Sequence, residues 1–402
     1  MSIGLMEAAQ LTRSGRLLEA TALIQRVLRH GSATVGGVDI EPGSNESAGN
    51  RVIDGNFSEI AEPANDGLIS TTNAAGNHLY RGFSPKIFLR SRRRVETPAN
   101  IPGPETTIVD EPLGRFVKGH YANAAGARPY KLYIPATCKE RPLFLVVMLH
   151  GCTQSPDDFA NGTRMNALAE ERKCLVLYPE QTRAANHSRC WNWFKRGDQL
   201  RDRGEPAILA GMTREIVSRY RIDPAKVYVA GLSAGGAMAA VMATAYPELY
   251  AAVGVHSGLA CGSAHDLPSA LAAMRGSQVG SSPNTGWKPL AAATPTIVFH
   301  GDRDKTVHPR NGDQVILQLL GQEGASTVNA STQHGQVPGG LAFTRTLHRD
   351  SSGRIVLEHW LVHRGGHAWF GGSPRGSYVD PKGPDATREM IRFFESTFGQ
   401  KS

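Results

Sequence analysis

One junction constrains the fold of this chain more than any other feature. The β-branched and aromatic run Val227-Tyr-Val-Ala passes through Gly231-Leu-Ser233-Ala-Gly235 into a long Ala- and Met-rich segment that ends at Tyr246. A strand that turns into a helix at Gly-x-Ser-x-Gly is typical of a nucleophile elbow, where the serine occupies a strained turn and the glycines leave room for it. Ser233 is therefore the predicted nucleophile.

The same junction predicts a site for a negatively charged oxygen. A helix beginning at Ala234 directs its unpaired N–H groups and positive dipole end toward the serine, where an oxyanion develops in acyl transfer. The turn His150-Gly-Cys152-Thr-Gln follows an apolar run at residues 143–149 and can supply a second donor. We predict an oxyanion hole formed by the N–H groups of Cys152 and Ala234. A plain glycine-rich turn is the alternative, which the strand before and the helix after it disfavour.

Length and charge exclude several classes of function. With 402 residues the chain can form one large α/β domain and a further segment. The net charge of +8 is modest and accompanies no nucleic-acid-binding motif, so we expect no nucleic-acid partner. No apolar run is long enough to span a membrane, and five cysteines are too few for a disulfide scaffold. The oligomeric state stays open.

Three regions follow one another along the chain. Residues 1–30 carry apolar side chains at helical spacing and predict an amphipathic helical segment; they show no secretory signal, which by itself indicates the cytoplasm. Residues 31–113 are rich in Gly, Ser, Asn and Pro and predict a largely disordered linker. Residues 114–402 alternate strand and helix patterns, which predicts an α/β catalytic domain with a mostly parallel, doubly wound sheet.

Ligands of such a sheet bind where strands end, so the residues after each strand are the candidates for chemistry. The predicted strands are 128–134, 143–149, 175–178, 227–230, 251–255, 296–299 and 355–362. The predicted helices are 165–172, 208–220, 234–246, 314–320 and 386–398.

Two carboxylates follow the strand that ends at residue 299, in His300-Gly-Asp302-Arg-Asp304-Lys-Thr-Val307. A carboxylate at a strand end can orient an imidazole, and both aspartates are candidates for that role. We favour Asp304, which lies further from the strand and has Val307 behind it.

The strand that ends at residue 362 is followed by His363-Arg-Gly-Gly-His367-Ala-Trp369. Glycines beside His367 let it reach over the nucleophile, so His367 is the predicted base, whereas His300 and His363 are interpreted as structural. The order Ser, Asp, His along the chain is that of the α/β-hydrolase fold. No histidine spacing resembles a metal site such as His-Glu-x-x-His, so we expect neither a metal nor a cofactor.

The chain resembles the polyhydroxybutyrate depolymerase family of esterases, which is related to feruloyl and acetylxylan esterases of the α/β-hydrolase fold. The resemblance spans residues 116–398 and rests on His150-Gly-Cys-Thr-Gln154, Arg189-Cys-Trp-Asn-Trp-Phe194, Gly231-Leu-Ser-Ala-Gly-Gly-Ala-Met238, His256-Ser-Gly and Gly366-His-Ala-Trp369. It implies Ser233, Asp304 and His367 as catalytic triad and Cys152 as oxyanion donor. It also implies a Cys152–Cys190 disulfide and an extracellular location.

Aromatic residues in these motifs are candidates for a substrate cleft. We predict that Trp191, Trp193 and Trp369 line it, with core packing as the alternative. The expected function is hydrolysis of short-chain polyhydroxybutyrate or its oligomers through an acyl-enzyme. Feruloyl or acetylxylan ester hydrolysis is the alternative within the same chemistry. A catalytically inactive binding scaffold is the alternative of another class, and it is disfavoured because no member of the Ser-Asp-His set is missing.

Overall fold

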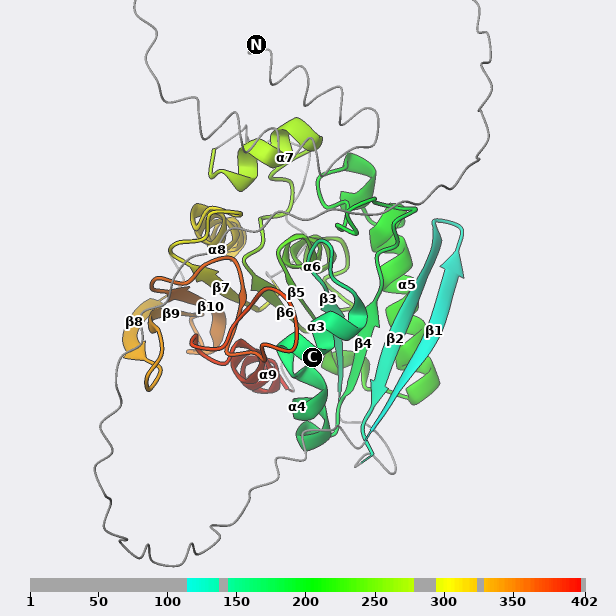
Figure 1. Cartoon of the computed structure of the whole chain (residues 1–402), viewed down its shortest axis with the longest axis horizontal. Helices are drawn as coiled ribbons and strands as arrows, with labels where there is room; N and C mark the ends of the chain where they lie inside the picture. The colour runs from blue at the N-terminus through cyan, green and yellow to red at the C-terminus, as the bar shows by residue number, and fades with distance from the viewer. Residues whose placement is uncertain (1–113, 137–143, 278–293, 324–328, 399–402) are drawn as a thin grey trace, which may run out of the picture. The chain divides into compact units, whose positions relative to one another are not determined.

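A computed structural model describes residues 114–136, 144–277, 294–323 and 329–398 (Figure 1). The predicted helical segment 1–30 and the predicted linker 31–113 lie outside the described residues, so the domain boundaries stay a prediction. Within the described ranges, the structure contains no helix that combines the length and the apolar character needed to cross a membrane.

The described residues build one ten-stranded sheet in the order β1-β2-β4-β3-β5-β6-β7-β10-β9-β8. Its central strands are parallel: β4 (Leu175–Pro179), β3 (Leu145–Leu149), β5 (Val227–Leu232), β6 (Ala252–His256), β7 (Thr296–Gly301) and β10 (Ile355–Val362). Antiparallel strands complete the two edges, β1 (Arg115–Asn123) with β2 (Gly126–Ile134) at one and β9 (Ala342–Arg349) with β8 (Asn329–Gln336) at the other. The mostly parallel sheet of an α/β-hydrolase fold is confirmed.

Helices cover both faces of this sheet (Figure 1). One apolar cluster joins the sheet to α5 (Gly204–Tyr220), α6 (Ala234–Ala245), α7 (Leu267–Met274) and α8 (Arg310–Glu323). A second cluster joins the other face to α3 (Pro156–Thr163), α4 (Met165–Arg172) and α9 (Ala386–Ser396). Two short 3-10 helices span Arg196–Gln199 and Pro224–Lys226, and a small second sheet pairs β11 (Trp369–Phe370) with β12 (Val379–Asp380).

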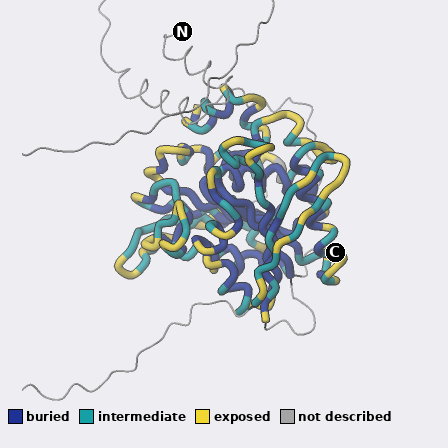
Figure 2. The backbone as a smooth tube through the Cα atoms, turned by 45° about the vertical axis from the view of Figure 1, so that its right-hand side comes forward, coloured by how far each residue is buried: buried dark blue, intermediate teal, exposed yellow. Residues whose placement is uncertain are grey.

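Strand β3 lies inside the sheet, and its packing explains why its sequence is continuously apolar. Leu145, Val147 and Leu149 pack into the cluster that contains α5 and α6, whereas Val146 and Met148 pack into the cluster that contains α4 and α9. Side chains alternate between the faces of a strand, so a strand covered on both sides must be apolar at every position. Figure 2 shows the central strands as the buried interior of the described region.

Several elements were absent from the sequence prediction. Strand β8, Asn-Ala-Ser-Thr-Gln-His-Gly-Gln, is mostly exposed and carries no apolar period; its pairing with β9 defines it. Helix α3 is short and polar, and it begins because Ser155 caps it and Pro156 takes the first turn. The Ser155 hydroxyl accepts the N–H of Asp158 at 3.2 Å. Strands β1 and β9 and helix α7 were also missed.

Candidate active site

Ser233 lies at the junction of β5 and α6 with φ 57° and ψ −119°, a left-handed backbone that is strained for a residue with a side chain. Its N–H donates to the carbonyl oxygen of His256 at 2.8 Å, which holds this conformation. A Cβ atom at Gly231 would lie 2.7 Å from the carbonyl oxygen of Leu149, and one at Gly235 would lie 2.6 Å from that of His150. Both glycines are needed because the end of β3 packs directly against the turn.

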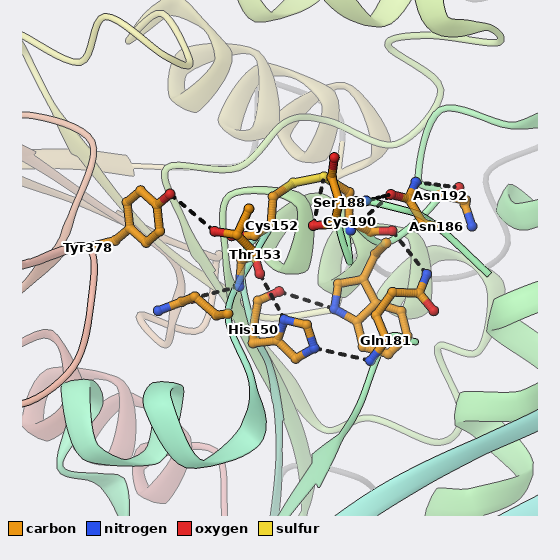
Figure 3. Close-up of a disulfide and its surroundings, with 12 residues drawn as sticks. His150, Cys152, Thr153, Gln181, Asn186, Ser188, Cys190, Asn192 and Tyr378 are labelled. Atoms are coloured by element: carbon orange, nitrogen blue, oxygen red, sulfur yellow. Dashed lines mark hydrogen bonds between the residues drawn. A yellow bond between two sulfur atoms is a disulfide. The ribbon is translucent and has the colours of Figure 1, made fainter. Parts of the chain in front are cut away.

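We call residues 150–154 the oxyanion loop. His150 is buried, and its Nδ1 lies 2.8 Å from the carbonyl oxygen of Gly151, which can only accept a proton. Nδ1 is therefore the donor, and Nε2 accepts the N–H of Gln181 at 3.1 Å (Figure 3). Burial lowers the pKa of His150 to about 4, so the imidazole stays neutral at pH 7 and keeps both contacts.

A disulfide joins Cys152 of the oxyanion loop to Cys190, the pair that the family resemblance implies (Figure 3). Beside it, the N–H of Thr153 donates to the carbonyl oxygen of Ser188 at 2.7 Å, and Thr153 has φ 67°. The loop that carries Cys190 is thus tied covalently and by a hydrogen bond to the oxyanion loop. Cys152 and Ala234, the two predicted oxyanion donors, lie on the two segments that meet at Ser233.

Glu205, at the start of α5, holds the loop that carries Cys190 in place, and it was not predicted from the sequence. It is buried and accepts the backbone N–H and the side-chain amide of Asn192, both at 2.7 Å. Its carboxylate also lies 3.2 Å from Nη2 of Arg128. A buried carboxylate with a cation and several donors is a strong anchor because an unpaired one would be costly. No motif in the sequence marks this residue.

Asp304 and His367 are brought together, although 63 residues separate them. Asp304 Oδ2 lies 2.7 Å from His367 Nδ1, and Asp304 Oδ1 accepts the N–H groups of Thr306 at 2.9 Å and Val307 at 2.8 Å. The carboxylate is fully buried, and the side chain of His367 is 11% exposed. Burial raises the pKa of Asp304, but the neighbouring His300 at 3.5 Å, the contact with His367 and the backbone N–H groups outweigh it, so the pKa is lowered. The carboxylate is therefore ionised and can hold an imidazole in one tautomer.

Asp302, the other candidate, contacts a different histidine. Its Oδ1 accepts the N–H of Arg364 at 2.6 Å, and its Oδ2 lies 3.2 Å from His363 Nδ1. The Nε2 atom of His363 lies 2.8 Å from the hydroxyl of Thr344. Both ring nitrogens of His363 therefore have protein partners, as expected of a structural histidine. The sequence analysis favoured Asp304 over Asp302, and in the structure Asp304 is the aspartate that contacts His367.

His256 connects the segments that carry Ser233 and His367. Its carbonyl oxygen accepts the N–H of Ser233, and its Nε2 accepts the N–H of Phe370 at 3.1 Å. Its ring stacks on Trp369 with centroids 4.9 Å apart. Burial is the main cause that lowers the pKa of His256 well below its usual range, and its neighbours His300 and His367 add to the shift, so Nε2 can accept. In the sequence, the feature that could have indicated this role of His256 is its position as a polar residue at the carboxyl end of an otherwise apolar strand.

The three tryptophans predicted to line a cleft are buried. Trp191 is 0%, Trp193 6% and Trp369 1% exposed. The indole N–H of Trp191 donates to the carbonyl oxygen of His150 at 3.1 Å, and that of Trp369 donates to the Thr387 hydroxyl at 3.0 Å. Trp191 packs against His150 of the oxyanion loop, Trp193 packs in the same core cluster, and Trp369 stacks on His256, so the alternative of core packing describes them better than substrate contact. Large apolar rings minimise free energy when they are removed from water.

Comparison with known proteins identifies the family of this chain. The family profile described as esterase PHB depolymerase matches residues 128–337, just over half of the chain. Poly(3-hydroxyalkanoate) depolymerase C of Paucimonas lemoignei is 31% identical over 246 residues, covering 59% of this chain and 56% of that protein. Acetylxylan esterase A of Talaromyces purpureogenus is 30% identical over 219 residues, covering 51% of this chain and 56% of that protein. The chain thus spans about half the length of these curated relatives.

Among solved structures, the acetyl xylan esterase from Aspergillus awamori superposes with a TM-score of 0.53 and 21% identity, covering 70% of this chain and 99% of that one. A likeness at this level of identity shows the α/β-hydrolase fold. The family match covers β2 to β8 and includes the elbow, the oxyanion loop and both aspartates. The chain therefore belongs to the esterase PHB depolymerase family.

Proposed function

We propose that the protein is a serine hydrolase of carboxylic esters. Two observations carry this proposal: Ser233 occupies a strained elbow, and a buried carboxylate orients His367 through a 2.7 Å contact. His256 joins the segments that carry the two residues, because it accepts the N–H groups of Ser233 and Phe370. A serine hydroxyl is a weak nucleophile until a neighbouring base removes its proton, and an oriented imidazole is the usual base. Family membership supports the same chemistry.

The tautomer of His367 determines the mechanism. Nδ1 of His367 donates to Asp304, which leaves Nε2 unprotonated and able to take the proton of the Ser233 hydroxyl as it attacks the ester carbonyl. The N–H groups of Cys152 and Ala234 hold the resulting oxyanion; the loss of one such donor slows related reactions by about 10²- to 10³-fold. The leaving alcohol takes the proton from His367. Water then attacks the acyl-enzyme by the same steps in reverse.

For the substrate we propose short chains or oligomers of a polyhydroxyalkanoate, such as polyhydroxybutyrate. The curated relatives that support this include depolymerases of poly(3-hydroxyalkanoate) and poly(3-hydroxybutyrate). Acetylxylan and feruloyl esterases also occur among the relatives, so hydrolysis of plant polysaccharide esters is the second candidate.

Replacing Ser233 by Ala tests the reaction. We expect hydrolysis of p-nitrophenyl butyrate to fall by roughly 10⁵- to 10⁶-fold in kcat, because no other group supplies the nucleophile. Ser218→Ala, at an exposed position of α5, is the matched control and should leave kcat unchanged. If pure Ser233→Ala protein keeps turnover near that of the wild type, the proposed mechanism is wrong.

The substrate is tested by comparing kcat/KM for p-nitrophenyl butyrate, a 3-hydroxybutyrate trimer, methyl ferulate and acetylated xylan. We expect the trimer to exceed methyl ferulate and acetylated xylan. A tenfold preference for either of the latter, about 1.4 kcal/mol of transition-state stabilisation, would replace the polyester proposal by the second candidate.

We also propose that the protein works in an oxidising compartment, against the cytoplasmic location that the sequence alone indicated. The Cys152–Cys190 disulfide supports this, since such bonds persist outside the reducing cytosol. Mass spectrometry of protein alkylated without reductant tests it: free alkylation of both thiols would count against an oxidising location.

A further inference from the structure

Tyr378 combines exposure with an unusual backbone. It lies between β11 and β12 with φ 53°, and 47% of its surface is exposed, so it is one of three exposed large apolar residues among those described. Its hydroxyl nevertheless lies 3.2 Å from the hydroxyl of Thr153 in the oxyanion loop (Figure 3). A strained, exposed tyrosine that reaches this loop needs an explanation, because a buried or relaxed position would be more stable.

The backbone of Ser377 and Tyr378 is held by contacts with two other segments. The carbonyl oxygen of Tyr378 accepts the N–H of Trp369 at 2.7 Å, two residues after His367. The N–H of Ser377 donates to Asp158 Oδ1 at 2.9 Å, and its carbonyl oxygen accepts from Gln154 Nε2 at 3.1 Å. The backbone at Tyr378 is therefore fixed between the segment of the proposed base and the oxyanion loop, and the side chain reaches Thr153 from this position.

The protons of this contact can be assigned. The Thr153 hydroxyl lies 2.6 Å from the carbonyl oxygen of Cys152, which can only accept, so the single proton of Thr153 is used there. The Tyr378 hydroxyl must then donate its own proton to Thr153. The phenolic oxygen is left with acceptor capacity only.

We propose that Tyr378 is a specificity-determining residue that contacts the substrate, and that its phenolic oxygen accepts a hydrogen bond from a hydroxyl group of the ester. The proposal rests on the ester-hydrolase function proposed above. Thr153 adjoins Cys152, so a substrate whose carbonyl oxygen occupies the oxyanion hole passes next to Tyr378. Hydroxyl-bearing esters, such as those of hydroxy acids, are preferred over their deoxy analogues because only they can donate to an acceptor.

The test uses two pairs of substrates that differ by one hydroxyl group. On the acyl side, p-nitrophenyl 3-hydroxybutyrate is compared with p-nitrophenyl butyrate, and on the alcohol side 2-hydroxyethyl butyrate is compared with propyl butyrate. In the full chain, Tyr378→Phe keeps the ring and removes the oxygen. We expect it to raise KM for the hydroxylated member of one pair by about 3- to 10-fold, as for one neutral hydrogen bond, with kcat unchanged. The deoxy member should change by less than about twofold.

Tyr220→Phe, at the last residue of α5, is the matched control and should alter neither pair. Equal losses on both members of both pairs, or no change on any, would overturn the proposal, since a merely structural tyrosine does not distinguish a hydroxyl. Wild-type protein that hydrolyses none of the four esters would instead refute the proposed function itself. If the wild-type protein is active but Tyr378→Phe keeps the same preference for the hydroxylated esters, only the role of Tyr378 is overturned.

Discussion

Two Asp–His pairs occupy the ends of the same two neighbouring strands, β7 and β10, and they differ in environment more than in chemistry. In the inner pair, Asp304 and His367 are 0% and 11% exposed and their contact is 2.7 Å. In the outer pair, Asp302 and His363 are 35% and 37% exposed and 3.2 Å apart. Water screens the outer pair, whereas the inner pair interacts through a medium of low dielectric constant. Burial, and not residue type, suits the inner pair to orient a base.

The backbone explains why both pairs can exist. Val362 pairs with Gly301 across the two parallel strands, and the N–H of Asp302 donates to the carbonyl oxygen of Val362 at 3.0 Å. A Cβ atom at Gly301 would lie 2.8 Å from the carbonyl oxygen of Gly366, so the two strand ends approach more closely than larger residues allow. The outer pair lies at the partly exposed side of these strand ends, and the inner pair is buried.

The largest expected effect is that of Asp304→Asn. We expect kcat on p-nitrophenyl butyrate to fall by about 10⁴-fold, because the amide favours the wrong tautomer of His367. Steady-state kinetics of the folded variant measure this. If Asp302→Asn reduced kcat more than Asp304→Asn, the roles of the two pairs would have to be exchanged.

The next effect is on stability against pH. The lowered pKa of Asp304 means that its ionised form stabilises the folded state above the ordinary aspartate pKa of about 3.9. That stabilisation is lost as pH falls from there toward the lower pKa of the folded state. We expect the free energy of unfolding of wild type, relative to Asp304→Asn, to decline by an amount on the order of 2 kcal/mol between pH 7 and strongly acidic solution. Urea denaturation at several pH values measures it, and a difference that did not change with pH would contradict the expectation.

Asp302→Asn should have a smaller effect. It weakens the contacts to Arg364 N and His363 at a partly exposed position, so we expect a loss of about 1 kcal/mol in the free energy of unfolding and less than a tenfold loss in kcat. Thermal unfolding and kinetics measured in parallel check both values. A loss of kcat as large as that of Asp304→Asn would show that the outer pair also orients the base.

Thr344→Val should have the smallest effect. It removes the hydroxyl that lies 2.8 Å from His363 Nε2, but water can replace it at this partly exposed ring. We expect a change within about 0.5 kcal/mol in the free energy of unfolding and kcat within about twofold of wild type. A larger loss of kcat would mean that the outer pair transmits position to His367 more strongly than its exposure indicates.

Local patterns in the sequence determined much of this protein. The strand before Ser233, the helix after it and the two glycines that the turn requires are all features of a few neighbouring residues, so the elbow could be predicted without the fold. The continuous apolar strands predicted the central parallel sheet for the same reason. The order Ser233, Asp304, His367 could be read along the chain.

The sequence favoured Asp304 over Asp302, but only the tertiary structure shows the contact of each aspartate with its histidine. Asp304 and His367 are 63 residues apart along the chain, and their contact depends on the relative position of two strand ends. The same holds for strand β8, which its partner defines, and for the tryptophans, whose burial depends on packing from several elements. Tyr378 and Thr153 lie 225 residues apart, and no local period relates them. Propensity and spacing act over a few residues, whereas burial and side-chain contacts arise from segments that meet only after folding.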